Sequence, residues 1–374
     1  MTNEISPFTV KNRFEKGRIN KSEYVDLLIY ILEENEDLNL RLKSLELLGN
    51  FRSKSRKIFS TLERCLITDE EEKIRSLSLL FILKNYRKEG EYTIKWVIKH
   101  EKSTKILKAL KNTLYSSEQR YKGLKEMFEK RMEEISNFYG TTGPETEFII
   151  DLEVELKPNY LYQINNTSKM ILSKYYLFLI KDNRITSLSL SLRESLPESI
   201  GFLTNLKHLD LSHNYFSILP EEFKHLDSLK TIDLSWNDFH EFPFTLSKIE
   251  FKYDVQLKLS HNSIECFPLE LKGLKKTKFL DLSFNHIDSI PMGIDSLESL
   301  EVLNLENNKI HEISEEISLL YSLKYLNLSN NKLDQLPESM RNMCSLEALD
   351  LRGNKLSDAP EFILRLPQLK EIYI

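Results

Sequence analysis

The chain has 374 residues, of which 41% are hydrophobic and 29% are charged, and its net charge is −5. This composition excludes a disordered chain and provides a sizeable core for two domains or one long repeat array. The three cysteines cannot form a disulfide framework, which predicts a reducing compartment, and the 10 glycines leave little material for phosphate-binding loops.

No targeting segment is evident in the sequence. The start, Met1–Val10, does not join a basic stretch to an apolar run, which argues against a secretory signal. No window reaches the roughly 18 uninterrupted apolar residues that a membrane span requires. We therefore expect a cytoplasmic protein without a membrane span.

The first part of the chain predicts a helical domain, residues 20–139, after an N-terminal arm, residues 1–19. Few Gly or Pro residues occur there, and apolar residues fall at helical spacing, as in Tyr24, Leu28 and Ile31. A weak repeat with one constant spacing matches Asp37, Ser44, Leu45, Leu47 and Leu48 to Asp69, Ser76, Leu77, Leu79 and Leu80. This pattern resembles short HEAT-like hairpins stacked as an α-solenoid, and a plain helical bundle is the alternative.

The two parts of the chain carry opposite charge. Residues 1–140 hold 28 Lys and Arg against 22 Asp and Glu, and the remainder holds 24 against 35. Basic clusters such as Arg52–Lys57 could bind nucleic acid or an acidic lipid surface. Because acids are interleaved with them, a solvated face or an acidic protein partner is the favoured interpretation, and nucleic acid is the less favoured one.

A boundary follows the helical domain. The sequence Gly-Thr-Thr-Gly-Pro at residues 140–144 predicts a linker, residues 140–146. Residues 147–184 predict a β cap, which begins with an alternating strand at Phe148–Leu156. Tyr175–Ile180 and Ile185–Leu190 then form a predicted hairpin.

Residues 185–374 form a repeat array. Leucine is in excess, with 63 in the chain, and many of them fall in the pattern Leu-x-x-Leu-x-Leu-x-x-Asn followed by an apolar residue and Pro. The Asn recurs at a constant spacing, apart from one longer step, at Asn214, Asn237, Asn262, Asn285, Asn308, Asn331 and Asn354.

This array resembles the leucine-rich repeat family, and its 23-residue period with Leu-Pro resembles the intracellular class related to the Ras-group proteins. The resemblance implies a horseshoe of parallel strands in which the Asn side chains form a ladder that satisfies backbone groups. The expected fold class is thus multi-domain: an all-α HEAT-like solenoid or helical bundle, followed by an α/β leucine-rich-repeat solenoid. The partner class that the resemblance implies is a regulator of small-GTPase, kinase or phosphatase signalling.

The residues between the leucines are predicted to face the concave surface at positions 3, 5, 7 and 8, counted from the first Leu. Position 5 carries an acidic column, and position 8 carries aromatic rings in four successive repeats. Exposed aromatic residues flanked by charge are typical interface anchors, although the Asp column could be a family default and the aromatic rings could be packing. The predicted partner-binding residues are His208, Asp210, His213, Asp233, Trp236, Lys258, His261, Phe279, Asp281, Phe284 and Tyr325.

One repeat is irregular. The interval between Asn237 and Asn262 has two extra residues, and Asp254 and Thr277 replace the first Leu in successive repeats. The segment Lys248–Tyr253 is therefore either a bulge or a docking element.

Catalytic motifs are absent from the sequence. We find no phosphate-binding loop, zinc motif, Cys pair or nucleophile elbow, and His213 and His261 lack metal-ligand spacing. We therefore expect a scaffold or adaptor that is not an enzyme, without cofactor or metal, whose concave face binds a folded protein. One alternative is a substrate-recognition subunit of a ligase or lyase, which would need a reactive Cys or an acid pair in residues 1–140, where Cys65 is the only Cys. Another is a nucleic-acid or membrane-surface binder that uses the basic helical half.

Overall fold

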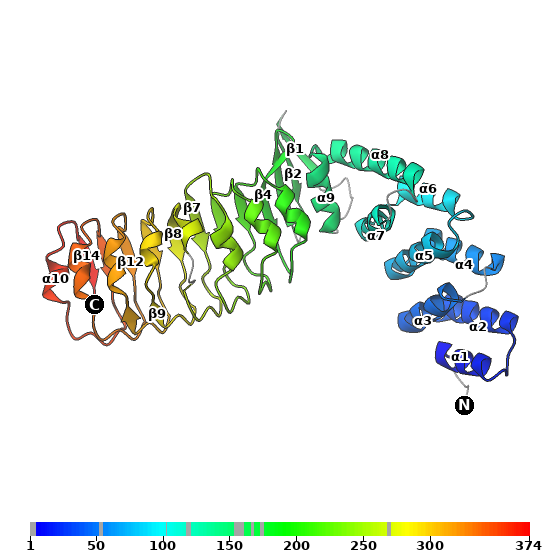
Figure 1. The fold of residues 1–374 in the computed structure, drawn as a ribbon, viewed down its shortest axis with the longest axis horizontal. Coiled ribbons are helices and arrows are strands. Elements are labelled where there is room, and N and C mark those ends of the chain that lie inside the picture. Colours follow the sequence, from blue (N-terminus) through cyan, green and yellow to red (C-terminus); the bar gives the residue numbers. More distant parts are fainter. Residues whose placement is uncertain are drawn as a thin grey trace. The chain divides into compact units, whose positions relative to one another are not determined.

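The structure is a computed structural model that describes residues 5–51, 55–101, 103–116, 121–152, 161–165, 168–172, 176–267 and 271–374. It divides into two compact units, Met1–Phe138 with Ile149–Lys157 and Tyr139–Phe148 with Pro158–Ile374. Helices account for the regular structure from residue 7 to residue 151, and a sheet of mostly parallel strands follows (Figure 1). The expected fold class, a helical domain followed by a strand solenoid, is confirmed.

The helices are short and lie close together in the chain. Polar residues cap several of them, as Asn20 does for α2 and Asp37 for α3, because a side-chain oxygen accepts the first free backbone N–H groups. Their bounds are α1 Pro7–Glu15, α2 Lys21–Glu34, α3 Leu38–Gly49, α4 Arg56–Thr68, α5 Glu72–Asn85, α6 Glu91–His100, α7 Thr104–Tyr115, α8 Lys122–Tyr139 and α9 Gly143–Asp151.

The predicted arm, residues 1–19, contains the helix α1. This helix contacts α2 and α3, and Val10 is fully buried. Phe14 stacks on Tyr24 with ring centroids 4.4 Å apart. Helix α1 is therefore part of the helical packing, because its apolar residues have partners there.

Helical hairpins stack in two layers. Helix α2 packs on α3, and α4 packs on α5. The second helices are neighbours, since α3 contacts α5 and α5 contacts α7. The first helices are joined by ion pairs, such as Lys57 of α4 with Asp26 of α2 at 2.6 Å. The first helices of successive hairpins thus lie side by side in one layer, and the second helices lie side by side in the other.

The helical repeat register predicted from the sequence is off by two positions at the first step. Helix α3 buries Ser44, Leu45 and Leu48, whereas α5 buries Ser78 and Leu79 at the places equivalent to Ser44 and Leu45. The reason is the helix start: Asp37 caps α3 directly, but α5 begins after Glu71, two positions beyond Asp69.

Asp69 has a second role, which is to join hairpins. Its carboxylate pairs with Arg41 of the preceding hairpin, and the backbone N–H of Glu71 donates to it. Glu101 repeats the arrangement one hairpin later, where it lies 3.8 Å from Arg75. All four ion-pairing side chains are largely buried, so the pairs fix the stacking of hairpins.

The second unit is a sheet that begins antiparallel and continues parallel. The strands β1 to β4 pair in sequence order as antiparallel neighbours, and β4 then pairs with β5 in parallel. Among the described residues, the sheet bounds are β1 Leu161–Asn165, β2 Ser168–Leu172, β3 Tyr176–Lys181, β4 Arg184–Leu190, β5 His208–Asp210, β6 Thr231–Asp233, β7 Val255–Lys258, β8 Thr277–Asp281, β10 Val302–Asn304, β12 Tyr325–Asn327, β13 Ala348–Asp350 and β14 Glu371–Tyr373.

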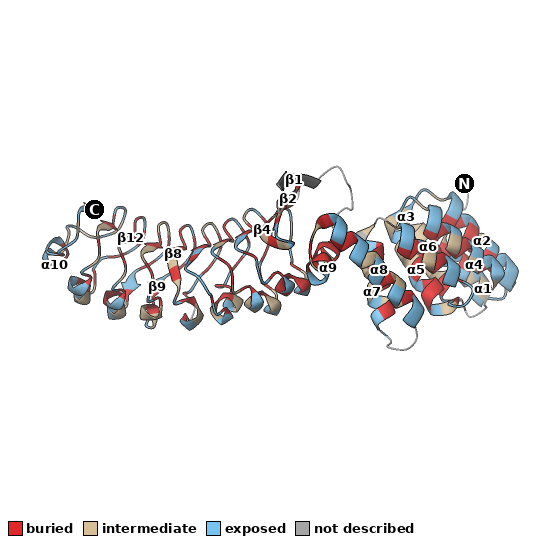
Figure 2. Cartoon of the chain, turned by 90° about the horizontal axis from the view of Figure 1, so that it is seen from above, coloured by how far each residue is buried: buried red, intermediate tan, exposed pale blue. Residues whose placement is uncertain are grey.

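The opposite side of the array is built from short turns. Most are 3-10 helices that begin at or near the Pro of each repeat, with one short parallel pair, β9 Ser289–Ile290 and β11 Glu312–Ile313. Their bounds are η2 Glu198–Phe202, η3 Glu221–His225, η4 Phe244–Lys248, η5 Lys272–Leu274, η6 Ile294–Ser296, η7 Glu315–Leu319, η8 Glu338–Asn342 and α10 Glu361–Leu364. The repeated leucines lie buried between the strands and these turns (Figure 2).

The predicted hairpin before the array is present. Strands β3 and β4 pair antiparallel, with Lys181 opposite Arg184. Asp182 and Asn183 between them have φ of 51° and 60°, the left-handed values that suit a two-residue turn.

The predicted strand Phe148–Leu156 is wrong over its described part. Residues Gly143–Asp151 form the helix α9, and residues 153–156 lie outside the described residues. Two signals for this helix were overlooked: Pro144 in the first turn, and the Thr142–Glu145 spacing of a capping box. Apolar side chains that are buried around most of the helix imitate a strand in the sequence.

Candidate partner-binding surface

The Asn ladder sets the geometry of the turns that follow the parallel strands from β5 to β13. Asn237, for example, donates through Nδ2 to the carbonyls of Leu211 and Leu234 at 2.8 and 3.0 Å. Its Oδ1 accepts the backbone N–H of Phe216 at 2.9 Å. The same contacts recur at the other ladder positions, so each Asn joins its own repeat to the preceding one.

The residue just before each ladder Asn adopts a left-handed backbone. His213, Trp236, His261 and Phe284 have φ of 56°, 58°, 54° and 54°. Their N–H groups donate to the next repeat, as Trp236 does to the Ser260 carbonyl at 2.9 Å. Position 8 therefore lies in the turn beyond the strand, at the edge of the strand face.

Their side chains form a continuous stack. Ring centroids are 5.4 Å apart for His213 and Trp236, 3.8 Å for Trp236 and His261, and 4.2 Å for His261 and Phe284. The planes deviate by 16° or less. This spacing follows from the separation of parallel strands, about 4.8 Å, which brings equivalent side chains into face contact.

The row of position-8 residues has an additional member that sequence reasoning missed. Leu192 has φ of 58° and occupies the equivalent place in the first repeat, since Leu188 pairs with Leu209. It was overlooked because this repeat is shorter than the others, so counting back one full period from His213 does not reach it. We call Leu192, His213, Trp236, His261 and Phe284 the apolar ridge.

Most of the ridge is accessible to solvent. Leu192, Trp236 and Phe284 are 57%, 49% and 42% exposed. Because the stacked rings cover one another's faces, a partner would contact the ring edges.

Beyond Phe284 the same turn uses other residue types. Asn307, Asn330 and Gly353 occupy position 8 there, with φ of 52°, 55° and 70°. These residues tolerate left-handed backbone, whereas it costs a bulky side chain about 1–2 kcal/mol. The turn itself therefore does not require the aromatic residues.

The acidic column has a local structural role. Asp210 accepts the backbone N–H and hydroxyl of Ser212 at 3.0 and 2.6 Å, and Asp281 does the same for Ser283. Asp233 accepts the N–H of Ser235 at 3.1 Å. These side chains shape the turn into position 8, so part of the column's hydrogen-bonding capacity is used within the repeat.

The remaining predicted residues lie on the strands. His208 Nδ1 is 2.9 Å from the Thr231 hydroxyl, and Lys258 pairs with Asp233 at 3.4 Å. A hollow of about 350 Å³ lies on this part of the strand face, lined by residues that include His208, Asp210, Asp233 and Lys258. Phe279 and Tyr325 lie outside this hollow, on β8 and β12.

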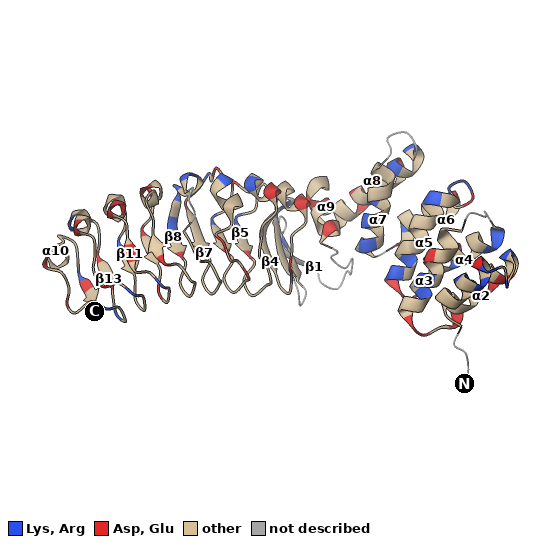
Figure 3. Ribbon diagram, turned by 60° about the horizontal axis from the view of Figure 1, so that its bottom comes forward, with Lys and Arg blue, Asp and Glu red and all other residues tan. Residues whose placement is uncertain are grey.

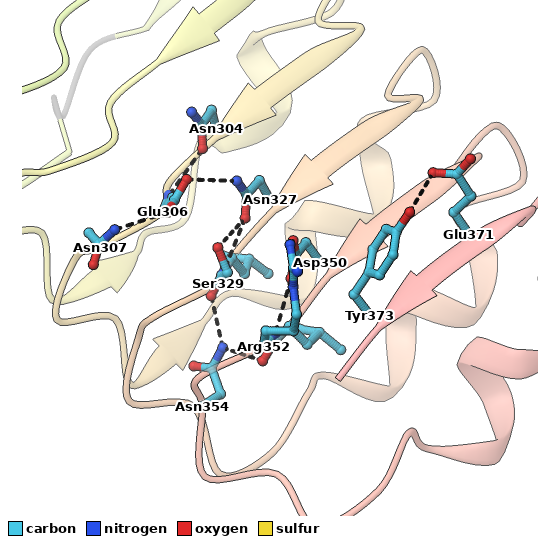
Figure 4. A network of polar contacts seen from close by, with 12 residues as sticks. Asn304, Glu306, Asn307, Asn327, Ser329, Asp350, Arg352, Asn354, Glu371 and Tyr373 are labelled. Carbon is cyan, nitrogen blue, oxygen red and sulfur yellow. Dashed lines mark hydrogen bonds and ion pairs between the residues drawn. The ribbon is translucent and has the colours of Figure 1, made fainter.

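The later strands carry an internal polar network instead. Glu306 accepts from Asn307 at 3.1 Å and from Asn327 at 3.4 Å, and Ser329 donates to Asn327 at 2.7 Å (Figure 4). Arg352 pairs with Asp350. Polar groups there satisfy one another, which separates this part of the face from the apolar ridge.

Two histidines of the surface favour the neutral form. Burial, and then the neighbouring Lys230 and Lys207, lower the pKa of His208. Burial lowers the pKa of His261 against the opposing effect of Asp281. A neutral imidazole suits the place of His261 between two aromatic rings.

The residue needed for a covalent enzyme mechanism is poorly suited to it. Cys65 is 5% exposed, and burial raises the pKa of its thiol to about 11, so the thiolate nucleophile is scarce at neutral pH. In the described part of the chain no three His, Cys, Asp or Glu side chains gather as a metal site would require. None of the described helices is both long and apolar enough to cross a membrane.

Comparison with known proteins identifies the repeat type. The family model for the leucine rich repeat matches residues 176–239 and 298–356. The chain carries leucine-rich repeats.

Two solved structures are similar to the chain. One is a leucine-rich repeat protein of Leptospira interrogans, 27% identical, with a TM-score of 0.42 over 51% of this chain and 55% of the other. The second is the plant peptide hormone receptor RGFR1 in complex with RGF2, 26% identical, with a TM-score of 0.38 over 50% and 34%. The chain thus spans about half of the first and a third of the second. No curated protein matches the sequence.

The leucine-rich repeats explain which sequence features are structural. The Leu and Asn columns build the array, and the Asp column supports its turns. The apolar ridge is what remains unexplained by the repeat, since later repeats form the same turn with Asn or Gly.

Proposed function

We propose that the protein is a non-catalytic scaffold whose leucine-rich repeats bind a folded protein through the apolar ridge and the neighbouring strand face. One observation carries this proposal: Trp236 and Phe284 keep an unfavourable left-handed backbone that Asn307 and Asn330 adopt at little cost. Strained residues that a fold does not need are candidates for function.

The composition of the surface supports the same function. Trp is among the residues that most often dominate binding energy, and a ring held by stacked neighbours loses little conformational freedom on binding. The hollow beside the ridge offers His208, Asp210, Asp233 and Lys258 as polar contacts. Charged groups at the rim of an apolar centre give orientation and specificity.

The partner class and the second domain extend the proposal. The 23-residue period resembles the intracellular class of repeats, which supports a cytoplasmic partner in small-GTPase, kinase or phosphatase signalling. The layered stacking of α2 to α7 supports the HEAT-like interpretation of the helical unit over a plain bundle, and such a solenoid would recruit a second protein.

The test replaces the ridge without disturbing its turn. In the double variant Trp236→Asn and Phe284→Asn, the new side chains are those that later repeats use in the same conformation. We expect affinity purification from the source organism to lose partners that the unmodified chain captures. The matched control is Tyr321→Asn, which removes an exposed aromatic side chain next to η7. Identical capture by the unmodified chain and the double variant would contradict the proposal.

A further inference from the structure

A second charged surface lies on the turn side of the array. Five lysines line an open groove of about 750 Å³ at η4 and η5: Lys248, Lys252, Lys272, Lys275 and Lys276. We call it the basic groove. Glu250 is the one acidic residue among the described lining residues. Figure 3 shows Lys and Arg positions in blue beside β7 and β8, in a half of the chain that is acidic as a whole.

The irregular repeat builds this groove. Ile249 ends η4 with an extended backbone, ψ 127°, where the equivalent leucines of other repeats have ψ near 50° to 70°. The two extra residues then extend the chain, and buried Ile249 and Phe251 anchor it in the core. The segment Lys248–Tyr253 is thus a fixed projection with an apolar anchor.

Gly273 allows η5, which forms the second wall of the groove, to pack closely against η4. A Cβ atom built on it would lie 1.7 Å from the Ser247 carbonyl oxygen, so only glycine lets η5 approach η4 at this point. The groove therefore has two walls held by direct backbone packing.

The lysines distinguish this repeat from the one that follows it. Lys272, Lys275 and Lys278 correspond, one repeat later, to Asp295, Glu298 and Glu301, so the charge is inverted at each place. Since the repeat fold accepts acids at these positions, folding alone does not explain the lysines.

Several of these charges are available to a partner. Lys272 and Lys275 make no ion pair within the described residues, and both are exposed. Lys248 pairs with Glu221 at 3.0 Å and Lys252 with Asp227 at 2.9 Å, and both pairs are solvent-exposed. Exposed pairs of this kind contribute about 0–1 kcal/mol, so a stronger anion can replace them.

The arrangement favours an extended acidic peptide over other anions. No Arg lines the groove within the described residues, and η5 has only three residues, so it lacks the forked donors and the helix end that fix a compact phosphate. Nucleic acid would need free aromatic faces for stacking. The two nearby rings, Phe244 and Tyr253, are already covered by Lys248 and Lys230 at 4.7 and 4.6 Å.

We propose that the basic groove docks an acidic segment of a protein partner. The lysines act as separate point charges along the groove, and each meets a carboxylate of the segment. This inference rests on different residues from the apolar ridge, so the two surfaces fail or succeed independently.

The test measures binding of the full chain to a fluorescein-labelled oligoglutamate peptide by fluorescence anisotropy. We expect binding that weakens between about 0.05 M and about 0.15 M salt, because the contacts are exposed and ionic. The variant Lys272→Glu with Lys275→Glu should lose affinity by about tenfold or more. The control Lys332→Glu with Lys355→Glu makes the same change in net charge on later repeats and should retain binding within about twofold.

Several outcomes would overturn the inference. Equal losses in the groove variant and the control would show an unspecific charge effect. Tighter, groove-dependent binding of a uridine oligonucleotide, or of vesicles that contain a phosphoinositide, would replace the acidic peptide with that ligand. Circular dichroism of each variant separates these results from misfolding, and Trp236→Asn should leave peptide binding unchanged.

Discussion

The indole ring of Trp236 lies against the imidazole of His261, with ring centroids 3.8 Å apart and planes 12° from parallel. Two residues from successive repeats thereby share one surface, because the long repeat still places them in adjacent turns. Because of this contact, the fluorescence of Trp236 can report the protonation of His261. The one other tryptophan in the sequence is Trp96, which can be replaced.

The first prediction concerns the protonation of His261. Burial lowers the pKa of His261 below the ordinary value of about 6.5. As the pH falls through 6.5, this histidine therefore takes up its proton in the unfolded chain before it does so in the folded chain. The free energy of unfolding should therefore decrease on acidification in this window. In a Trp96→Phe background, the emission of Trp236 should be quenched by the imidazolium with a midpoint below 6.5. His261→Phe should remove this step, and a midpoint above that ordinary value would contradict the assigned shift.

The second prediction concerns backbone strain at Trp236. Replacement by Asn should leave the free energy of unfolding unchanged or raise it by up to about 1 kcal/mol, because Asn tolerates the left-handed turn. Replacement by Val should lower it by about 1–3 kcal/mol, because a β-branched residue does not. Urea denaturation followed by circular dichroism measures both. A Val variant as stable as the Asn variant would show that the turn is not strained.

The third prediction concerns the buried ion pair at the start of the sheet. Arg184 Nε donates to Glu145 at 2.9 Å, and Glu145 is fully buried in α9. Arg184→Met should cost about 3–5 kcal/mol, because it leaves a buried charge without its partner.

The pH dependence of that variant has a definite sign. Burial already raises the pKa of Glu145 against the opposing effect of Arg184, and the variant should raise it further. The folded state then holds a proton that the unfolded state releases, so stability falls as pH rises through the window above about 4.3. The cost of Arg184→Met should be larger at about pH 8 than at about pH 5, as thermal melts can show. An equal cost at both values would argue against an ionised Glu145.

The fourth prediction compares two ladder positions. Asn285 is buried and Nδ2 donates to the Leu259 and Leu282 carbonyls, each at 3.0 Å. Asn285→Ala should cost about 2–4 kcal/mol, since several buried backbone groups lose their partners. Asn354→Ala should cost less, because this Asn is only half-buried and water can reach the groups it leaves. Denaturation of both variants under one condition tests the order.

Much of the array could be predicted from sequence because each repeat is a local pattern. The Leu and Asn columns fix the strand, the turn and the repeat register, and the hairpin before the array follows from turn residues such as Asp182 and Asn183. The helical half was harder. There the register depends on where α5 begins relative to Asp69. Similar residues recur at one spacing in the sequence, but the buried positions of α3 and α5 are two residues further apart than that spacing.

The candidate surface was also predicted from the sequence only in part. Sequence alone placed His213, Trp236, His261 and Phe284 in one column, because equal spacing implies equal positions. It missed Leu192, whose repeat is short, and it could not show that the Asp side chains are engaged in turns. It also marked Lys248–Tyr253 as irregular without showing that Lys272 and Lys275 lie on the same groove.

The sequence by itself determined that leucines are buried, that asparagines follow the strands, and that one repeat is long, since each of these depends on neighbours within a few positions. The tertiary structure alone decided the backbone conformation of Trp236, the stacking of its ring and the close packing of η5 against η4. These depend on how successive repeats approach one another, which hydrogen bonds and close packing between repeats determine.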